Sequence, residues 1–322
     1  MRLRLVPQET NIDFFKYARL TFGGSVVAMV LSIGIWLAMG LNFGIDFLGG
    51  TTIRTQSAVA VDVGLYRDAL APLALGDVSI TQVFDPTFGP EQNVAMIRIQ
   101  AQEGAEAVTP AIIAAVEAAL IAVVPDISFP SVESVGPKVS GELIQTAIIA
   151  VLASLAAILV YIWLRFEWQF SVGAVAALIH DVILTIGIFS LLQIRFDLAT
   201  IAALLTIIGY SINDTVVIFD RLRENLIKYK SRPLQDVMNL SANETLSRTL
   251  MTSGTTLIAL LALLILGGDV IRGFVFAIFW GVIVGTYSSI YVAKNVVLMI
   301  GVKRDWSKPD QKSGTQFSNI DA

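Results

Sequence analysis

Six long apolar segments constrain the fold of this chain more than any other feature of its sequence. Each is long enough to cross a hydrocarbon core of about 30 Å, which takes about 20 helical residues. They cover residues 18–41, 143–164, 170–192, 198–219, 249–266 and 274–300. Charged residues make up only 15% of the chain, whereas soluble globular domains have roughly 25%. The sequence therefore predicts a polytopic α-helical membrane protein with six transmembrane helices.

Lysine and arginine residues predict the orientation of these spans, because cytoplasmic loops carry an excess of both. They concentrate in residues 1–17, in a loop of residues 221–248 and in residues 301–322. The short connections on the other side, "QIRFD" and "GGDVIRG", contain one arginine each. Both termini are therefore expected in the cytoplasm and residues 42–141 on the far side of the membrane. Residues 301–322 are polar without periodicity, so we expect a disordered tail there.

Residues 42–141 have the pattern of a separate soluble domain between the first and second spans. Alternating apolar residues in "TTIRTQ", "VSITQVF" and "VAMIRIQ" indicate strands, and "ISFPSVESV" supplies a fourth. Helical periodicity in "VDVGLYRDALAPLAL" and "TPAIIAAVEAALIAVV" indicates two helices. The order βαββαβ is that of a ferredoxin-like fold. We therefore expect a ferredoxin-like α+β insert, followed by the second to sixth spans in residues 142–300.

The fourth span contains a carboxylate that requires an explanation. In "IIGYSINDTVVIFDRLREN", Asp214 lies inside the apolar run, where a charged side chain costs about 2.5–3.5 kcal/mol at the helix centre. On a helix, Thr206, Tyr210, Asn213 and Asp214 form one polar stripe. Intramembrane carboxylates commonly mark ion or proton pathways, so we interpret Asp214 as a relay residue. A structural hydrogen bond between helices is the alternative.

The third span has a second polar patch in "ALIHDVILT", where His180 and Asp181 lie near the middle. Adjacent helical residues point about 100° apart, so the two side chains cannot both face one site squarely. Either could line a pathway while the other bonds a neighbouring helix. We interpret Asp181 as a second relay residue and His180 as part of its polar lining.

The fifth span offers a counter-charge for Asp214. In "SRTLMTSGTTLIAL", Arg248, Thr252 and Thr256 share a face, with Ser253 beside them. Counted from the far ends of their spans at about 1.5 Å per residue, Asp214 and Arg248 lie at similar depth. They can form a pair if the two helices adjoin. An ordinary cytoplasmic anchor is the alternative interpretation of Arg248.

The segment "PLQDVMNLSANETL", before the fifth span, places Leu234, Val237, Met238 and Leu240 on one side of a helix. This pattern is typical of an amphipathic helix lying at the membrane interface. A helix packed on the bundle fits the pattern equally well.

Several functional classes are excluded by composition or spacing. No cysteine and a single histidine leave no multi-ligand metal site, and a net charge of −4 argues against nucleic-acid binding. "GIDFLGG" and "VGPKVSGEL" lack the spacing of phosphate-binding loops, so no nucleotide cofactor is implied. Their residues are interpreted as tight turns at the membrane boundary: Gly44, Asp46, Gly49, Gly50, Gly136 and Pro137.

Six motifs in a fixed order resemble the SecF family of membrane subunits in the bacterial protein-export apparatus. They are "FGIDFLGG", "ESVGPKVSGEL", "FEWQFSVGAVAALIHDV", "IGYSINDTVVIFDRLREN", "SRTLMTSGTTL" and "GVIVGTYSSIYVA". SecF belongs to the RND superfamily, whose working unit is a twelve-span bundle. The resemblance implies that this chain is half of such a bundle and that SecD is the other half.

The resemblance also implies a function. SecD and SecF together use the proton motive force to promote preprotein translocation through SecYEG, and YajC and YidC are further candidate partners. Asp214 and Arg248 match the family's proton-relay positions. The location implied is the bacterial inner membrane, with the insert in the periplasm. No enzymatic activity is expected.

Three other functions compete with this one. An RND-type exporter of small molecules or lipids is the main alternative, although such exporters usually carry two much larger inserts. An intramembrane aspartyl protease needs two facing carboxylates, one normally within Gly-x-Gly-Asp, whereas the contexts here are "LIHD" and "SIND". A passive scaffold that only holds a partner is the third.

Overall fold

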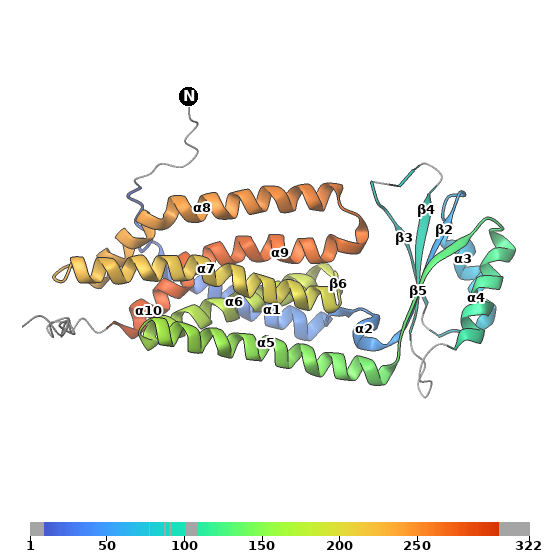
Figure 1. Cartoon of the computed structure of the whole chain (residues 1–322), viewed down its shortest axis with the longest axis horizontal. Coiled ribbons are helices and arrows are strands. Elements are labelled where there is room, and N and C mark those ends of the chain that lie inside the picture. Colours follow the sequence, from blue (N-terminus) through green and yellow to red (C-terminus); the bar gives the residue numbers. More distant parts are fainter. Residues whose placement is uncertain (1–9, 77, 87, 90–91, 101–108, 303–322) are drawn as a thin grey trace, which may run out of the picture.

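The computed structural model of this chain has an elongated shape, with a bundle of long helices at one end and a small α+β domain at the other (Figure 1). It describes residues 10–76, 78–86, 88–89, 92–100 and 109–302. The tail predicted to be disordered therefore lies almost entirely outside the described residues, as do the first nine residues.

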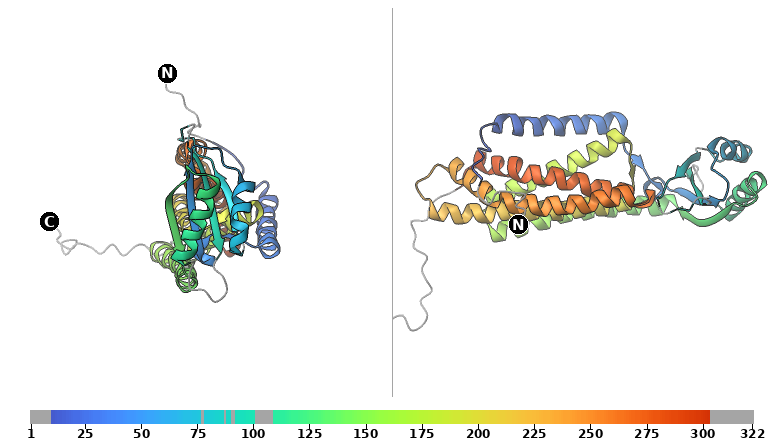
Figure 2. Two further views of the ribbon diagram at one scale, coloured as in Figure 1. Left: turned by 90° about the vertical axis from the view of Figure 1, so that its right-hand side faces the viewer. Right: turned by 90° about the horizontal axis from the view of Figure 1, so that it is seen from above.

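Six helical paths within the described residues are long and apolar enough to cross a membrane, which confirms the predicted fold class. The first five are α1 (Ala18–Met39), α5 (Pro137–Arg165), α6 (Trp168–Leu192), α7 (Leu198–Lys228) and α8 (Leu234–Leu266). The sixth path consists of α9 (Asp269–Ser288), a π-helical segment (Ser289–Ala293) and α10 (Lys294–Ile300). Helices α6, α7 and α9 pack at the centre, and α1 lies on the outside against α6 (Figure 2).

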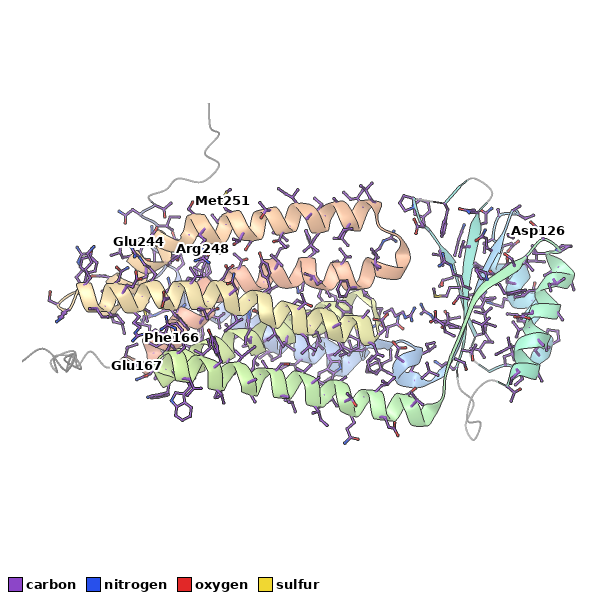
Figure 3. The ribbon with its side chains drawn as sticks, viewed as in Figure 1. Asp126, Phe166, Glu167, Glu244, Arg248 and Met251 are labelled. Atoms are coloured by element: carbon purple, nitrogen blue, oxygen red, sulfur yellow. The ribbon has the colours of Figure 1, made fainter. Side chains whose placement is uncertain are left out.

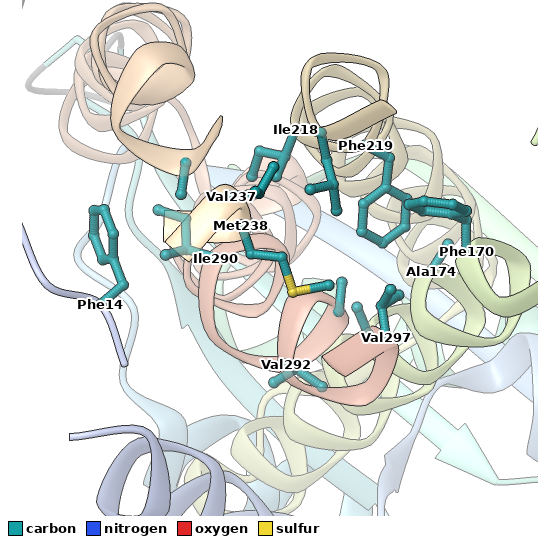
Figure 4. Packing of buried hydrophobic residues seen from close by; sticks show 14 of the residues in the cluster. Phe14, Phe170, Ala174, Ile218, Phe219, Val237, Met238, Ile290, Val292 and Val297 are labelled. Carbon is teal, nitrogen blue, oxygen red and sulfur yellow. The ribbon is translucent and has the colours of Figure 1, made fainter. Parts of the chain in front are cut away.

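The predicted loop of residues 221–248 is wrong in its extent. Helix α7 continues to Lys228 and α8 begins at Leu234, so only residues 229–233 connect them. The charged residues that mark the end of the apolar span do not end the helix, because a helix can continue past the lipid into water. The amphipathic segment before the fifth span is the start of α8, and its Val237 and Met238 are buried against Ile218 and Ile290 (Figure 4). It packs on the bundle.

The insert has the predicted ferredoxin-like topology. Its elements are β2 (Gly50–Ser57), α3 (Val63–Leu70), β3 (Val78–Val83), β4 (Asn93–Gln100), α4 (Pro110–Val123) and β5 (Ser128–Val135). The strand order is β3-β4-β2-β5, and every neighbouring pair is antiparallel. A short 3₁₀ helix (Ala71–Leu73) follows α3. Side chains of Asp62 and Thr109 cap the two helices, as N-cap residues do.

The two helices of the insert cover one face of its sheet, and the other face is turned toward the bundle (Figure 1). The covered face holds an apolar core that includes Ile53, Ile97, Val116 and Leu120. Because side chains alternate along a strand, the residues between these core positions point toward the end of the bundle.

The predicted turn residues join the insert to the bundle. Strand β1 (Asn42–Phe43) pairs in parallel with β6 (Arg195–Phe196), and α2 (Ile45–Leu48) follows it. The Asp46 carboxylate accepts a hydrogen bond of 3.0 Å from the backbone N–H of Leu198, the first residue of α7. Gly49 and Gly50 have φ of 73° and 128°, a backbone region that favours glycine. Gly136 precedes α5 as its N-cap, and Pro137 is the first residue of that helix.

Two glycines let helices approach closely, Gly187 of α6 against α1 and Gly281 of α9 against α7, and we expect their substitution by alanine to destabilise the bundle. A Cβ on Gly187 would lie 2.3 Å from Ser32 Cβ, and a Cβ on Gly281 would lie 2.3 Å from Ile207 Cγ1. Overpacking of this kind costs roughly 1–3 kcal/mol. The measurement is the midpoint of thermal unfolding in detergent for Gly187→Ala and Gly281→Ala.

The control is Gly254→Ala in α8, where a new Cβ would meet no atom within 4 Å. That change is expected to leave the midpoint equal or slightly higher, because alanine favours helix more than glycine by about 1 kcal/mol. Equal unfolding midpoints for all three variants would contradict the close helix contacts at Gly187 and Gly281.

Candidate functional site

The Asp181 carboxylate lies at the centre of the bundle, where three helices supply its hydrogen bonds. Its side chain is completely buried. Oδ2 accepts from Ser211 Oγ of α7 at 2.6 Å and from Ser288 Oγ of α9 at 2.9 Å. Oδ1 lies 2.9 Å from Nδ1 of its neighbour His180. The carboxylate is therefore held by donors on both oxygens, as a buried polar group requires.

His180 connects this carboxylate to the outer helix α1. Its ring stacks on that of Tyr287 at a centroid distance of 6.2 Å. The Tyr287 hydroxyl donates to the Thr21 carbonyl oxygen at 2.9 Å and accepts from Ser25 Oγ at 3.2 Å. The His180 Nε2 atom is buried without a hydrogen-bond partner. His180 and Asp181 thus contact each other, although adjacent helical residues point about 100° apart.

Asp214 is buried one helical turn after Ser211 on α7, in a much sparser environment than that of Asp181. Its Oδ2 accepts one hydrogen bond, from Ser253 Oγ of α8 at 3.4 Å. The same Ser253 hydroxyl lies 2.7 Å from Thr286 Oγ1 of α9. Asp214 therefore contacts one hydroxyl group, on α8, which in turn contacts a hydroxyl group on α9, whereas Asp181 has three contacts of its own.

The predicted ion pair between Asp214 and Arg248 is not formed in this structure. Within the described residues, the ion pairs do not include either side chain. Arg248 is exposed instead, at the end of the bundle opposite the insert, as Figure 3 shows. Helices α7 and α8 do adjoin, which was the condition for a pair between these two residues. The arginine side chain extends toward solvent, where hydration stabilises its charge.

Arg248 borders a cavity of about 420 Å³ that opens on this end of the bundle. The other lining residues are Arg165, Val216, Val217, Asp220, Arg221, Glu224, Glu244 and Thr245. Val217 lies three residues after Asp214 on α7, so the cavity begins about one helical turn from the carboxylate. This short distance would let water and the arginine approach Asp214 after a small rearrangement.

Other predicted lining residues face outward. Thr206, Asn213 and Thr252 are exposed on the outer surface of α7 and α8. The hydroxyls of Thr206, Thr252 and Thr256 donate to carbonyl oxygens of their own helices. Tyr210 bridges the two helices through a bond of 3.3 Å to Thr256. Of the predicted lining on α8, only Ser253 points into the bundle.

The sequence-based prediction missed the hydroxyl groups of α9 and two on α7. Ser288 and Thr286 contact the groups described above, and Ser289 Oγ lies 2.8 Å from Thr215 Oγ1 of α7. Ser289 begins the π-helical segment, a distortion that is frequent at functional sites. A usable signal was present, because "GTYSS" places four hydroxyl residues inside an otherwise apolar span.

Removing one donor from Asp181 is expected to destabilise the bundle. Ser211→Ala and Ser288→Ala each leave a buried carboxylate oxygen with one partner fewer, which costs roughly 1–3 kcal/mol. The midpoint of thermal unfolding in detergent should fall for both variants.

Thr206→Ala is the matched control, because that hydroxyl is exposed and bonds only to its own helix. Its midpoint should stay at the wild-type value. If the serine variants also keep the wild-type midpoint, the hydrogen bonds to Asp181 do not hold the three helices together.

Known protein-export proteins resemble this chain over nearly its whole length. A family model described as "Protein export membrane protein SecD/SecF, C-terminal" matches residues 115–303, and a SecD/SecF GG motif matches residues 34–61. The chain is 67% identical to the protein translocase subunit SecF of Cereibacter sphaeroides, over 100% of this chain and 99% of that protein. It is 63% identical to the SecF subunit of Rhodobacter capsulatus, over 99% and 97% of the two chains.

Solved structures give the same relationship. The crystal structure of SecDF from Thermus thermophilus, described as a translocon-associated membrane protein, matches with a TM-score of 0.81 and 37% identity. A super-membrane-facing form of SecDF matches with a TM-score of 0.68 and 38% identity. Both matches cover 93% of this chain but only 40% of the SecDF chain. The chain therefore corresponds to one part of a longer relative.

Proposed function

The chain belongs to the SecF branch of the SecD/SecF family of protein-export membrane proteins, and we propose that it uses proton flow to promote preprotein movement through the SecYEG channel. In this proposal SecD forms the other half of the bundle, and YajC and YidC join the assembly. The description of SecDF as translocon-associated supports the proposed connection to a channel. The chain acts as a transport subunit without an enzymatic activity of its own.

The main support for the proposal is that Asp214 is an ionisable group in surroundings that stabilise its charged form poorly. A buried carboxylate with a single hydrogen bond of 3.4 Å is poorly stabilised as an anion. The guanidinium of Arg248 stands at the edge of a cavity that begins about one turn away. An arginine close by favours the ionised carboxylate, and its withdrawal favours the protonated one. Asp214 can therefore take up and release a proton as the two side chains separate and approach.

Arg248 serves in this scheme as a fixed positive charge, because a guanidinium does not lose its proton in proteins. Asp181, with His180 and its serine donors, extends the polar path toward the insert. Ser211, which donates to Asp181, comes three residues before Asp214 in α7. It therefore lies closer to the end of α7 that adjoins the insert. The hydroxyls of Ser253 and Thr286 extend the path across α8 and α9.

The energy available is sufficient for such a cycle. Moving one charge through 100 mV provides about 2.3 kcal/mol, and one unit of pH difference adds about 1.4 kcal/mol. A few kcal/mol shifts a two-state equilibrium strongly. SecDF has been solved in two forms, and this chain matches them with TM-scores of 0.81 and 0.68. A fold that adopts two arrangements is what a proton-coupled device needs.

The competing functions find less support. Asp181 and Asp214 have no hydrogen-bond partner in common among the described residues, whereas an aspartyl protease holds its two carboxylates against each other. The relatives reported above are translocase subunits, which favours protein export over the export of small molecules or lipids.

The outward-facing polar groups support a partner on α7 and α8. Asn213, Thr206 and Thr252 would face lipid if this bundle stood alone. Polar side chains in a membrane almost always face protein or a water-filled cavity. We place the SecD half on this surface.

The distribution of lysine and arginine orients the complex with both termini in the cytoplasm and the insert in the periplasm of the inner membrane. A phosphatase reporter fused within the insert tests this orientation, because the enzyme is active only outside the cytoplasm.

The first functional prediction concerns Asp214. In vesicles that import preprotein, Asp214→Asn should abolish the increase in translocation caused by an imposed proton gradient, because the amide cannot exchange a proton. Arg248→Lys should weaken the same increase, since an ammonium does not reproduce the guanidinium fork. The measurement is preprotein protected from protease, with and without the gradient.

Asp68→Asn, on an exposed position of the insert, is the matched control and should respond fully to the gradient. A full response from Asp214→Asn as well would make Asp214 a structural residue and remove the relay. Equal insertion and equal SecD recovery for all variants are required for the comparison.

The second functional prediction concerns the SecD surface. The chain has no cysteine, so Asn213→Cys places a single thiol on the outer face of α7. Cross-linking in membranes that contain SecD should attach this variant to SecD. Val30→Cys, exposed on α1, is the control and should give no such product. If Val30→Cys cross-links to SecD and Asn213→Cys does not, the partner covers a different face.

A further inference from the structure

A cavity of about 650 Å³ lies between the insert and the adjacent end of the bundle. Figure 1 shows the two parts on either side of it, with the uncovered face of the sheet turned toward the helix ends. The sheet contributes Thr52, Arg54, Met96 and Arg98. The bundle side contributes Ile194, Arg195, Asp197, Leu264, Arg272, Phe274 and Phe276.

Three buried polar atoms that line this cavity have no hydrogen-bond partner. They are Thr52 Oγ1, Arg98 Nε and Arg195 Nε, of which Arg195 Nε also lies 3.5 Å from Asp197 Oδ2 in an ion pair. Two other guanidinium nitrogens reach only the Met96 sulfur, Arg98 Nη2 at 3.4 Å and Arg195 Nη1 at 3.8 Å. A thioether is a weak acceptor. A buried donor without an acceptor costs roughly 1–3 kcal/mol, so several donors around one cavity point to a missing acceptor.

The charges around the cavity favour an anion. The described lining contains four arginines, Arg54, Arg98, Arg195 and Arg272, and three carboxylates, Asp46, Glu133 and Asp197. Asp197 pairs with Arg195 at 3.5 Å, and the lining keeps an excess of one positive charge.

Arg98 in particular is in an unfavourable position for a cation. Burial and, to a smaller extent, the nearby Arg195 lower its pKa to about 10, while Asp197 opposes the change. Two guanidiniums, one from the insert and one from the bundle, are held close together around a sulfur atom. An anion between them would relieve this repulsion.

We propose that this cavity binds a phosphate-bearing anion between Arg98 and Arg195, with the headgroup of an anionic phospholipid as the main source. Guanidinium groups bind phosphate through paired hydrogen bonds, and the Thr52 hydroxyl supplies another donor. Leu264, Phe274 and Phe276 lie on the bundle side and provide an apolar surface for acyl chains. The cavity adjoins the ends of membrane spans, where a headgroup of the leaflet on the insert side lies. A soluble phosphate is the second source.

Such a ligand would bridge the two parts of the molecule. Arg98 belongs to β4 of the insert, and Arg195 belongs to β6, just before α7. A headgroup held by both would fix the insert relative to the helix that carries Asp214. The site is independent of the proton-relay proposal, since neither arginine contacts the relay residues.

The experiment is a titration of the purified full chain in detergent. Phosphatidylglycerol and phosphatidylcholine are added in separate series, and bound lipid is counted by native mass spectrometry. Inorganic phosphate is added in a third series and measured by calorimetry. Phosphatidylglycerol should bind more tightly than phosphatidylcholine, and Arg98→Gln and Arg195→Gln should each weaken it about tenfold, since each removes a hydrogen bond to a charged group.

Arg67→Gln is the matched control, because this arginine is exposed on α3 and makes the same change of charge. It should bind phosphatidylglycerol like the wild type. The Arg98 and Arg195 variants lie in separate parts of the fold, so a failure of one to fold leaves the other as a test.

The three series distinguish the sources. Arginine-dependent binding of phosphatidylglycerol alone supports the lipid headgroup. Arginine-dependent binding of inorganic phosphate that blocks the lipid supports the soluble anion in the same site. Binding of both probes that is unchanged in Arg98→Gln and Arg195→Gln overturns the proposal.

Discussion

The cost of burying the Asp181 carboxylate determines how the central helices pack. In lipid no water can satisfy this group, so its donors must come from the protein. Ser211 and Ser288 supply them from α7 and α9, and His180 supplies the third contact from α6 itself. These hydrogen bonds form only when the three helices meet at one depth and in one rotation. The close approach at Gly281 is part of the same packing, because it brings α9 against Ile207 of α7.

The surroundings of Asp181 suit a residue that holds helices together, whereas those of Asp214 suit a residue that exchanges a proton. Asp181 is enclosed and saturated with hydrogen bonds, so a change in its protonation would disturb three helices at once. Asp214 accepts one long hydrogen bond, from Ser253. It lies about one helical turn from a cavity. Its neighbour Asn213 lies on the face assigned to SecD. A group that must take up and release a proton needs this looser environment. In our proposal Asp214 therefore takes up and releases the proton, while Asp181 positions the helices and extends the polar path toward the insert.

The sequence predicted the elements well and their contacts poorly, for physical reasons. Apolar length identified six spans, and alternation identified the strands of the insert, because both properties belong to single segments. The partners of a polar residue depend on which helices adjoin, so Ser211 and Ser288 were missed. The possible pair of Arg248 with Asp214 is not formed in this structure and stays a prediction. Lys294 was missed as well, although it is almost completely buried in the sixth span with its Nζ 4.1 Å from the Phe15 ring centre. No periodicity within that span predicts a lysine covered by the N-terminal segment.

The connections between the insert and the bundle explain how proton exchange at Asp214 can move the insert. Helix α7 carries Asp214 about 24 Å from its start at Leu198, counted over 16 residues. That start is capped from outside by Asp46, two residues after the Gly44 turn that leads into the insert. On the return path, Ser140 in the first turns of α5 donates to the Ile45 carbonyl oxygen. Both connections of the insert therefore meet at α2, which itself contacts the first residue of α7. Because a helix transmits displacement along its axis better than a loop does, a shift of α7 that accompanies proton exchange would move this junction, and with it both strands that enter and leave the insert.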